Sequence, residues 1–177
     1  MKTFPVPTRE EVSPANQILF DNLTKMAGHV PNLFAVFAHS ENALGNYLTL
    51  NGGKTSLRAK EREVVNLVVS QVNKCLYCLS AHTAIGKMQG FTDEQVLEVR
   101  RAEIKFDAKL DALAKLVKGI AENQGHADPQ LVENFYAAGY NKGSLMDVVI
   151  AVGDKIISNY VFALTEVPID FPIAPEL

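Results

Sequence analysis

The sequence has few of the features that mark secreted, membrane-spanning and disordered chains. Two cysteines in 177 residues are too few for the disulfide framework of a small secreted domain. Eight prolines and eleven glycines are too few for a collagenous or linker protein, and an apolar content of 47% excludes a disordered chain. No window approaches the roughly 20 uninterrupted apolar residues that a membrane-spanning helix needs. We therefore expect a soluble, cytoplasmic protein with a buried core and no membrane partner.

Charge of one sign is also scarce. Seventeen Lys and Arg residues stand against twenty Asp and Glu residues, and the net charge of -3 includes no long run of one sign. Such a surface offers little to attract phosphates, so we expect no nucleic-acid partner. Residues 1–13 contain two prolines and a charged cluster where a secretory signal would have an apolar stretch, which predicts that the chain is not exported.

Helix signals recur along the whole chain, and strand signals hardly appear. N-capping residues, prolines at helix starts and glycines at helix ends bound apolar residues at helical spacing. The predicted helices run from Pro14 to Gly28, from Pro31, from Ser40 to Gly52, over 57–73, over 75–88, from Thr92, from Asp107 to Gly125, from Pro129, and from Ser144 to Leu164. We predict one all-α domain over residues 1–177, with extended N- and C-terminal tails.

The helix predicted over 75–88 carries a CxxCxxxH pattern. Cys75, Cys78 and His82 are offset by three, four and seven positions, which at about 100° per residue return to nearly the same helix face. A cysteine at a helix start can be held as a thiolate by the helix dipole, while a nearby histidine takes its proton. The pattern predicts thiol redox chemistry, in which a sulfenic acid on one cysteine condenses with the other. The plain alternative is two small side chains packed in a core.

A polar stripe lies on the preceding apolar helix. Glu63, Asn66 and Ser70 are offset by three and seven positions, whereas Glu61 must face elsewhere. If this helix folds back against the next one, Glu63 can exchange protons with His82, with Asn66 and Ser70 supporting it. The alternative is that the stripe is the solvated edge of the helix.

These residues resemble the core motif of a known family. The matching positions are Glu63, Cys75, Tyr77, Cys78 and His82. They are similar to the E, CxxC and H motif of the AhpD-like alkylhydroperoxidases, in the carboxymuconolactone decarboxylase superfamily, and most of all to members labelled peroxidase-related. The specific motif covers about residues 57–90, and the closing residues 159–172 also look like the tail of that subgroup.

The resemblance implies roles for the motif residues. It makes Cys78 the thiol that attacks peroxide, Cys75 the resolving thiol, and Glu63 with His82 the proton relay. Tyr77 stands where well-studied relatives carry a histidine; a phenol with an ordinary pKa near 10 donates a hydrogen bond but is a poor base at neutral pH. The decarboxylase branch lacks the cysteine pair, so the resemblance does not imply decarboxylation.

The resemblance also implies an AhpD-like fold, a thiol-dependent peroxidase that reduces small hydroperoxides with an unidentified dithiol reductant, and a homo-oligomer, a trimer or a hexamer. We expect no cofactor and no metal. Two alternatives stay open. The cysteine pair could be a redox-sensing switch in a non-catalytic protein, or Cys75, Cys78, His82 and Glu63 could hold a zinc ion, although the chain offers no second CxxC or HxxxH pair.

Overall fold

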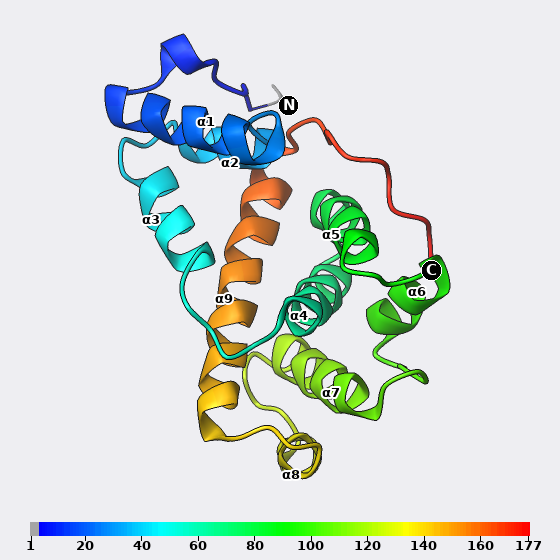
Figure 1. Cartoon of the computed structure of the whole chain (residues 1–177). Helices are drawn as coiled ribbons and strands as arrows, with labels where there is room; N and C mark the ends of the chain where they lie inside the picture. The colour runs from blue at the N-terminus through cyan, green and yellow to red at the C-terminus, as the bar shows by residue number, and fades with distance from the viewer. Residues whose placement is uncertain (1–3) are drawn as a thin grey trace. The chain divides into compact units, whose positions relative to one another are not determined.

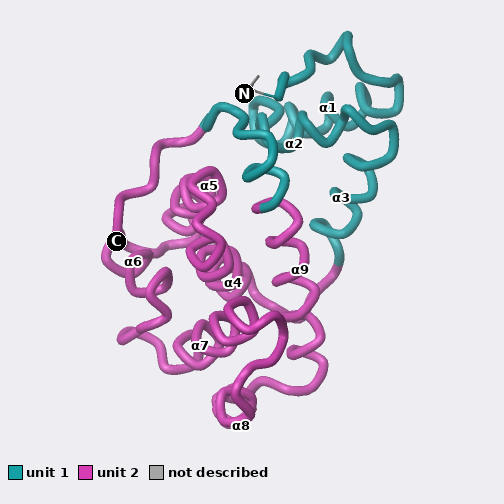
Figure 2. Tube along the Cα trace, turned by 180° about the vertical axis from the view of Figure 1, so that it is seen from behind, with its two compact units in different colours: residues 1–53, 160–170 teal, residues 54–159, 171–177 magenta. Residues whose placement is uncertain are grey.

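The computed structural model describes residues 4–177, and every regular element in that range is helical (Figure 1). The all-α prediction is therefore confirmed. The chain divides into two compact units, one formed by residues 1–53 and 160–170 and the other by residues 54–159 and 171–177 (Figure 2). The expectation of one domain over the whole chain stays a prediction.

The first unit contains three α-helices and a short 3₁₀ helix. Its elements are η1 (Arg9–Glu11), α1 (Pro14–Ala27), α2 (Asn32–Phe37) and α3 (Ala43–Asn51). The Ser13 side chain accepts a hydrogen bond from the backbone N–H of Asn16 at the start of α1, and Gly28 ends that helix in the left-handed conformation. Both ends match the sequence signals, because a β-carbon disfavours the positive φ that Gly28 adopts. The small core of this unit consists of Val12, Phe20, Ala35, Ala38 and Leu44.

The second unit is built around α4 (Ala59–Val72). The other helices are α5 (Leu76–Met88), α6 (Asp93–Arg101), α7 (Ala108–Glu122) and α8 (Pro129–Ala137). Helices α5, α6 and α7 all pack against α4, and Figure 1 shows α4 between α5 and α7. This arrangement explains the sequence of α4, because its valines are buried on every side that a neighbour covers. The capping box predicted at Thr92 is present at the start of α6.

Helix α9 (Lys142–Thr165) begins two residues earlier than the predicted Ser144. The side chain of Asn141 accepts hydrogen bonds from the backbone N–H and the hydroxyl of Ser144, so Asn141 takes the capping role that the sequence suggested for Ser144. By length and composition α9 is also the one helix of residues 4–177 that could cross a membrane, a property that it shares with core helices of soluble proteins. Its polar residues Lys155, Ser158 and Asn159 are buried.

The C-terminal segment is extended, as its three prolines predict. The segment from Phe171 onward is attached to the second unit by specific contacts. The backbone N–H of Ala174 donates to Ser80 Oγ at 3.0 Å, and Arg100 Nη1 donates to the carbonyl of Pro175 at 2.7 Å. These bonds hold the tail against α5 and α6.

Candidate active site

The turn between α4 and α5 brings the two halves of the motif together. Lys74 adopts a left-handed conformation with φ 53°, and the backbone N–H of Cys75 donates to the carbonyl of Ser70 at 2.9 Å. This closed turn reverses the chain at once, so α4 and α5 pack side by side. Glu63 on α4 thereby lies opposite His82 on α5, as the sequence analysis expected.

The two cysteines occupy the start of α5. Cys75 is the N-cap residue, and its sulfur accepts a hydrogen bond from the backbone N–H of Cys78 at 3.4 Å. Both side chains are buried, with exposures of 3% for Cys75 and 2% for Cys78. The pair is reduced in this structure. A small oxidant must therefore gain access through motion of the surrounding residues.

The environment makes the two thiols unequal. A hydrogen bond from Cys75, aided by the positive charges of Lys155 and His82, lowers the pKa of Cys78 to about 5 despite its burial. The same hydrogen bond, together with burial, raises the pKa of Cys75. At neutral pH the arrangement therefore favours a thiolate on Cys78 beside a protonated Cys75.

Glu63 and His82 form a buried ion pair. His82 Nδ1 lies 2.8 Å from Glu63 Oε2, and Asn66 Nδ2 donates to Glu63 Oε1 at 3.0 Å. Burial raises the pKa of Glu63, but the charge of His82 and its hydrogen bond more than offset this effect and lower the pKa overall. Ser70, the third residue of the stripe, is buried too. The stripe therefore faces the protein interior and is not a solvated edge.

Three site residues come from α9 and were not identified from the sequence. Lys155 Nζ lies 2.8 Å from His82 Nε2, and Cys78 Sγ lies 3.9 Å from Ser158 Oγ. The amide of Asn159 donates to Ser70 Oγ at 3.3 Å. The signal that could have found them is a cluster of polar residues within an otherwise apolar helix.

Two other residues singled out from the sequence lie elsewhere. The ring of Tyr77 is buried and packs edge to face against Phe171, with centroids 5.7 Å apart. Glu61 faces away from Glu63, as expected, but it is buried instead of solvated. Its carboxylate accepts hydrogen bonds from the backbone N–H of Arg58 at 2.7 Å and from the hydroxyl of Tyr140 at 3.0 Å.

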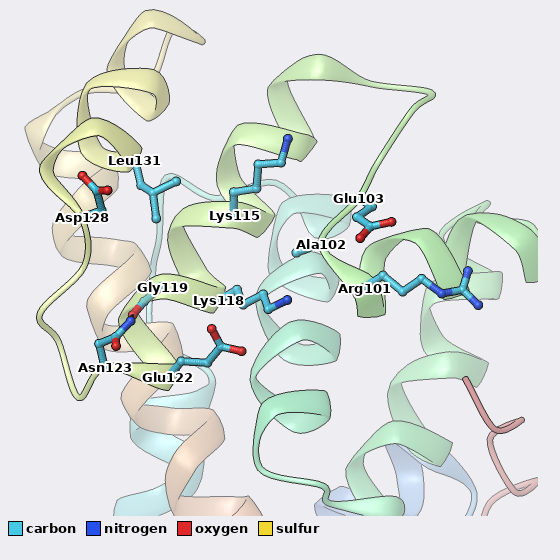
Figure 3. A pocket seen from close by; sticks show the side chains of 10 residues that line it. All are labelled: Arg101, Ala102, Glu103, Lys115, Lys118, Gly119, Glu122, Asn123, Asp128 and Leu131. Atoms are coloured by element: carbon cyan, nitrogen blue, oxygen red, sulfur yellow. The ribbon is translucent and has the colours of Figure 1, made fainter.

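A separate surface pocket of about 380 Å³ lies between the end of α6, α7 and the start of α8 (Figure 3). Its lining mixes Lys115 and Lys118 with Glu103 and Glu122, so it presents no single charge, and it includes none of the residues of the motif. Within residues 4–177 no three His, Cys, Asp or Glu side chains are grouped closely enough to hold a metal ion.

Comparisons with known proteins agree with this geometry. The carboxymuconolactone decarboxylase family matches residues 37–118, the segment that contains the whole motif. A peroxidase-related protein from Silicibacter sp. TM1040 has 22% identity and a TM-score of 0.80, with 94% of this chain and 91% of that one covered. An AhpD-core peroxidase-related protein from Ralstonia eutropha JMP134 has 18% identity and a TM-score of 0.85, with 95% and 92% covered.

The chain is an AhpD-like member of the carboxymuconolactone decarboxylase superfamily. The fold of this superfamily also serves another reaction, since the debrominase Bmp8, solved in complex with 2,3,4-tribromopyrrole, superposes with a TM-score of 0.78 at 11% identity over 96% of this chain and 92% of its own. No curated protein sequence matches the chain. Relatives of the AhpD-like fold thus include enzymes, and the resemblance predicted from the sequence motif is confirmed.

Proposed function

We propose that this AhpD-like protein is a thiol-dependent peroxidase that reduces small hydroperoxides through Cys78 and Cys75. The observation that carries the proposal is the contact of 2.8 Å between Glu63 and His82, one helical turn from Cys78 in the same buried site. A carboxylate paired with a histidine beside a thiol is a combination that moves protons. A structural cysteine pair needs no such neighbours.

The proposed reaction has two steps on the protein. The Cys78 thiolate attacks the terminal oxygen of the hydroperoxide, so that an S–O bond forms, the O–O bond breaks, and the alkoxide leaves with a proton from the His82 chain. Cys75 then displaces water from the sulfenic acid, giving a disulfide, with the thiol proton leaving in the water. A small dithiol reduces the disulfide by exchange and is itself oxidised to its disulfide.

Two features support this division of roles. Cys78 is the cysteine with the lowered pKa, and the thiolate is the form that attacks peroxides. Cys75 is one helical turn away and stays protonated, which suits a resolving thiol that acts second. The low exposure of both sulfurs favours hydrogen peroxide and small alkyl hydroperoxides over bulky lipid peroxides.

The proposal is tested by turnover. The purified protein is incubated with excess dithiothreitol and hydrogen peroxide or tert-butyl hydroperoxide, and peroxide loss is followed over many equivalents. We expect steady consumption that Cys78→Ser abolishes. Oxidation that stops after one equivalent per chain in the presence of the dithiol would instead identify a redox sensor.

Two further measurements address the remaining alternatives. Zinc at one atom per chain in the purified protein would favour the metal-site interpretation. Parallel incubation with 2,3,4-tribromopyrrole addresses the reaction of the debrominase relative. Debromination without any peroxide turnover would contradict the peroxidase proposal.

A further inference from the structure

Lys155 is a buried cation whose place at the site no motif predicted. Its side chain projects from α9 toward α5, its exposure is 4%, and its Nζ lies 2.8 Å from His82 Nε2. Burying an ammonium group is unfavourable unless nearby groups compensate for the lost hydration. The position of Lys155 therefore calls for a role that uses its charge.

The contacts of His82 define the proton arrangement. An ammonium group donates hydrogen bonds and cannot accept them, so Nε2 of His82 must be the acceptor toward Lys155. The other ring nitrogen, Nδ1, then carries the proton and donates it to Glu63. Both ring nitrogens are thus engaged, and His82 has no free nitrogen to take the Cys78 proton while Lys155 is in place.

Helix α9 also connects Lys155 to Cys78. Ser158, one turn further along α9, donates its hydroxyl to the carbonyl of Lys155 at 3.0 Å and lies 3.9 Å from Cys78 Sγ. The same turn of α9 therefore faces both His82 and the sulfur. The charged chain runs from Glu63 through His82 to Lys155, with the thiolate of Cys78 near its positive end.

We infer that Lys155 is a positioning residue of this site, whose ammonium group holds His82 as the Nδ1–H tautomer and supplies the positive charge that balances the Cys78 thiolate. The inference rests on the proposed thiol chemistry for its purpose, although not for its test. The titratable groups around Cys78 are Cys75 and His82 on α5, Lys155 on α9, and Glu63 behind His82 on α4. Of these four side chains, only the lysine is of a type that is cationic in water across the whole neutral range.

The decisive variant is Lys155→Met, which keeps the length and apolar stem of the side chain and removes the charge. Lys142→Met is the matched control, because Lys142 is an exposed lysine on the same helix. The ionisation of Cys78 is followed by the ultraviolet absorbance of the thiolate and by the rate of alkylation with iodoacetamide. Both are measured in a Cys75→Ser background, so that a single thiol reports.

We expect Lys155→Met to shift the thiolate titration upward by about one pH unit or more and to slow alkylation near pH 6 by about tenfold, with recovery at high pH. Lys155→Arg, which restores the charge, should keep most of the shift from being lost. Lys142→Met should change neither quantity. An unchanged titration in a folded Lys155→Met protein would overturn the inference, as would equal shifts in the two Met variants.

A second measurement needs no variant. Nitrogen-15 chemical shifts of the His82 ring in the reduced wild-type protein should show protonated Nδ1 and unprotonated Nε2. A ring protonated on Nε2 alone would contradict the inference. Both experiments read proton positions, not turnover, so they can succeed even if the protein consumes no peroxide, and peroxide consumption can persist even if Lys155 fails them.

Discussion

His82 Nδ1 lies 2.8 Å from Glu63 Oε2, although the two residues are 19 positions apart and on different helices. The contact depends on the tight turn at Lys74, which reverses the chain between α4 and α5. The proton chemistry of the site is therefore coupled to the packing of this helix pair. A change that separates α4 from α5 should disturb thiol reactivity as well as stability.

The first prediction is that Glu63 and His82 act as one unit. Glu63→Gln and His82→Gln should each slow the reaction of Cys78 with hydrogen peroxide by about 10²-fold at neutral pH, since each breaks the same relay. The double variant should be little slower than either single variant, because coupled groups are not additive. Rapid-mixing measurement of sulfenic acid formation gives the three rates.

The control for this comparison is Glu133→Gln, the same chemical change at an exposed position of α8. It should leave the rate unchanged. Raising the pH should partly restore the Glu63 and His82 variants, because hydroxide then ionises the thiol. Defects that multiply in the double variant, without rescue at high pH, would show that the two residues act independently.

The second prediction concerns pH. Because the pKa of Cys78 is lowered to about 5, the thiolate is already formed at neutral pH. Alkylation of Cys78 should therefore be nearly constant from about pH 6 to 8 and fall tenfold per unit below pH 5. The depressed pKa also means that this ionisation stabilises the folded state above the pKa of an unfolded thiol, and that the contribution is lost as the pH falls toward 5. A rate that keeps rising through pH 8 would indicate an ordinary thiol.

The third prediction separates the two cysteines. Cys75→Ser should react once with peroxide and stall as a sulfenic acid on Cys78, which a dimedone-type reagent traps. Its Cys78 pKa should also rise, because the hydrogen bond from Cys75 is lost. Wild type should instead lose both free thiols to an internal disulfide after one equivalent of peroxide. Trapping of a sulfenic acid on Cys75 in Cys78→Ser would reverse the assignment.

The sequence was sufficient to predict the helices and one half of the site. Helix periodicity and caps such as Ser13 and Thr92 are local signals, and the geometry within α5 follows from the offsets between Cys75, Cys78 and His82. The approach of Glu63 could be suggested because its helix directly precedes α5. In each case the partners are neighbours in sequence.

The other half of the site depends on tertiary packing and was not predicted. Lys155 is 73 residues from His82, and periodicity carries no information about which distant helix covers a given face. The division of the chain into two compact units was also not expected, because α9 contributes residues to both. The polar cluster in α9 was visible as a pattern, yet only its contacts explain it.

The fourth prediction concerns Tyr77, which the packing assigns to the tail. Its ring meets Phe171 edge to face, so Tyr77→Ala should remove a buried aromatic contact and lower stability by about 3–5 kcal/mol. The C-terminal segment should then become more accessible to limited proteolysis. Phe171→Ala should have the same effect on proteolysis. If the tail keeps its protection in both variants, the bonds at Ser80 and Arg100 hold it without the rings.

The last prediction is that Glu61 stabilises the fold without taking part in the thiol chemistry. Its carboxylate caps the start of α4 through the backbone N–H of Arg58, accepts from the hydroxyl of Tyr140, and lies 3.6 Å from Lys109 Nζ. Burial raises the pKa of Glu61, but the hydrogen bonds from Arg58 outweigh it and lower the pKa overall. Glu61 therefore contributes stability above the carboxyl pKa of the unfolded chain, and the contribution is lost as the pH falls through the lower folded value.

Glu61→Gln should accordingly lower the free energy of unfolding by about 1–3 kcal/mol at neutral pH, because a buried acceptor and its charge are lost. The difference from wild type should shrink in acid, where the wild-type carboxyl is itself protonated. Thermal melts at several pH values measure the first effect, and titration of the Cys78 thiolate measures any effect on the site. We expect the melting temperature to fall and the thiolate titration to stay in place, because Glu61 faces away from Glu63 along α4. If Glu61→Gln shifted the Cys78 titration as far as Glu63→Gln does, the proton relay would not be specific to the buried stripe.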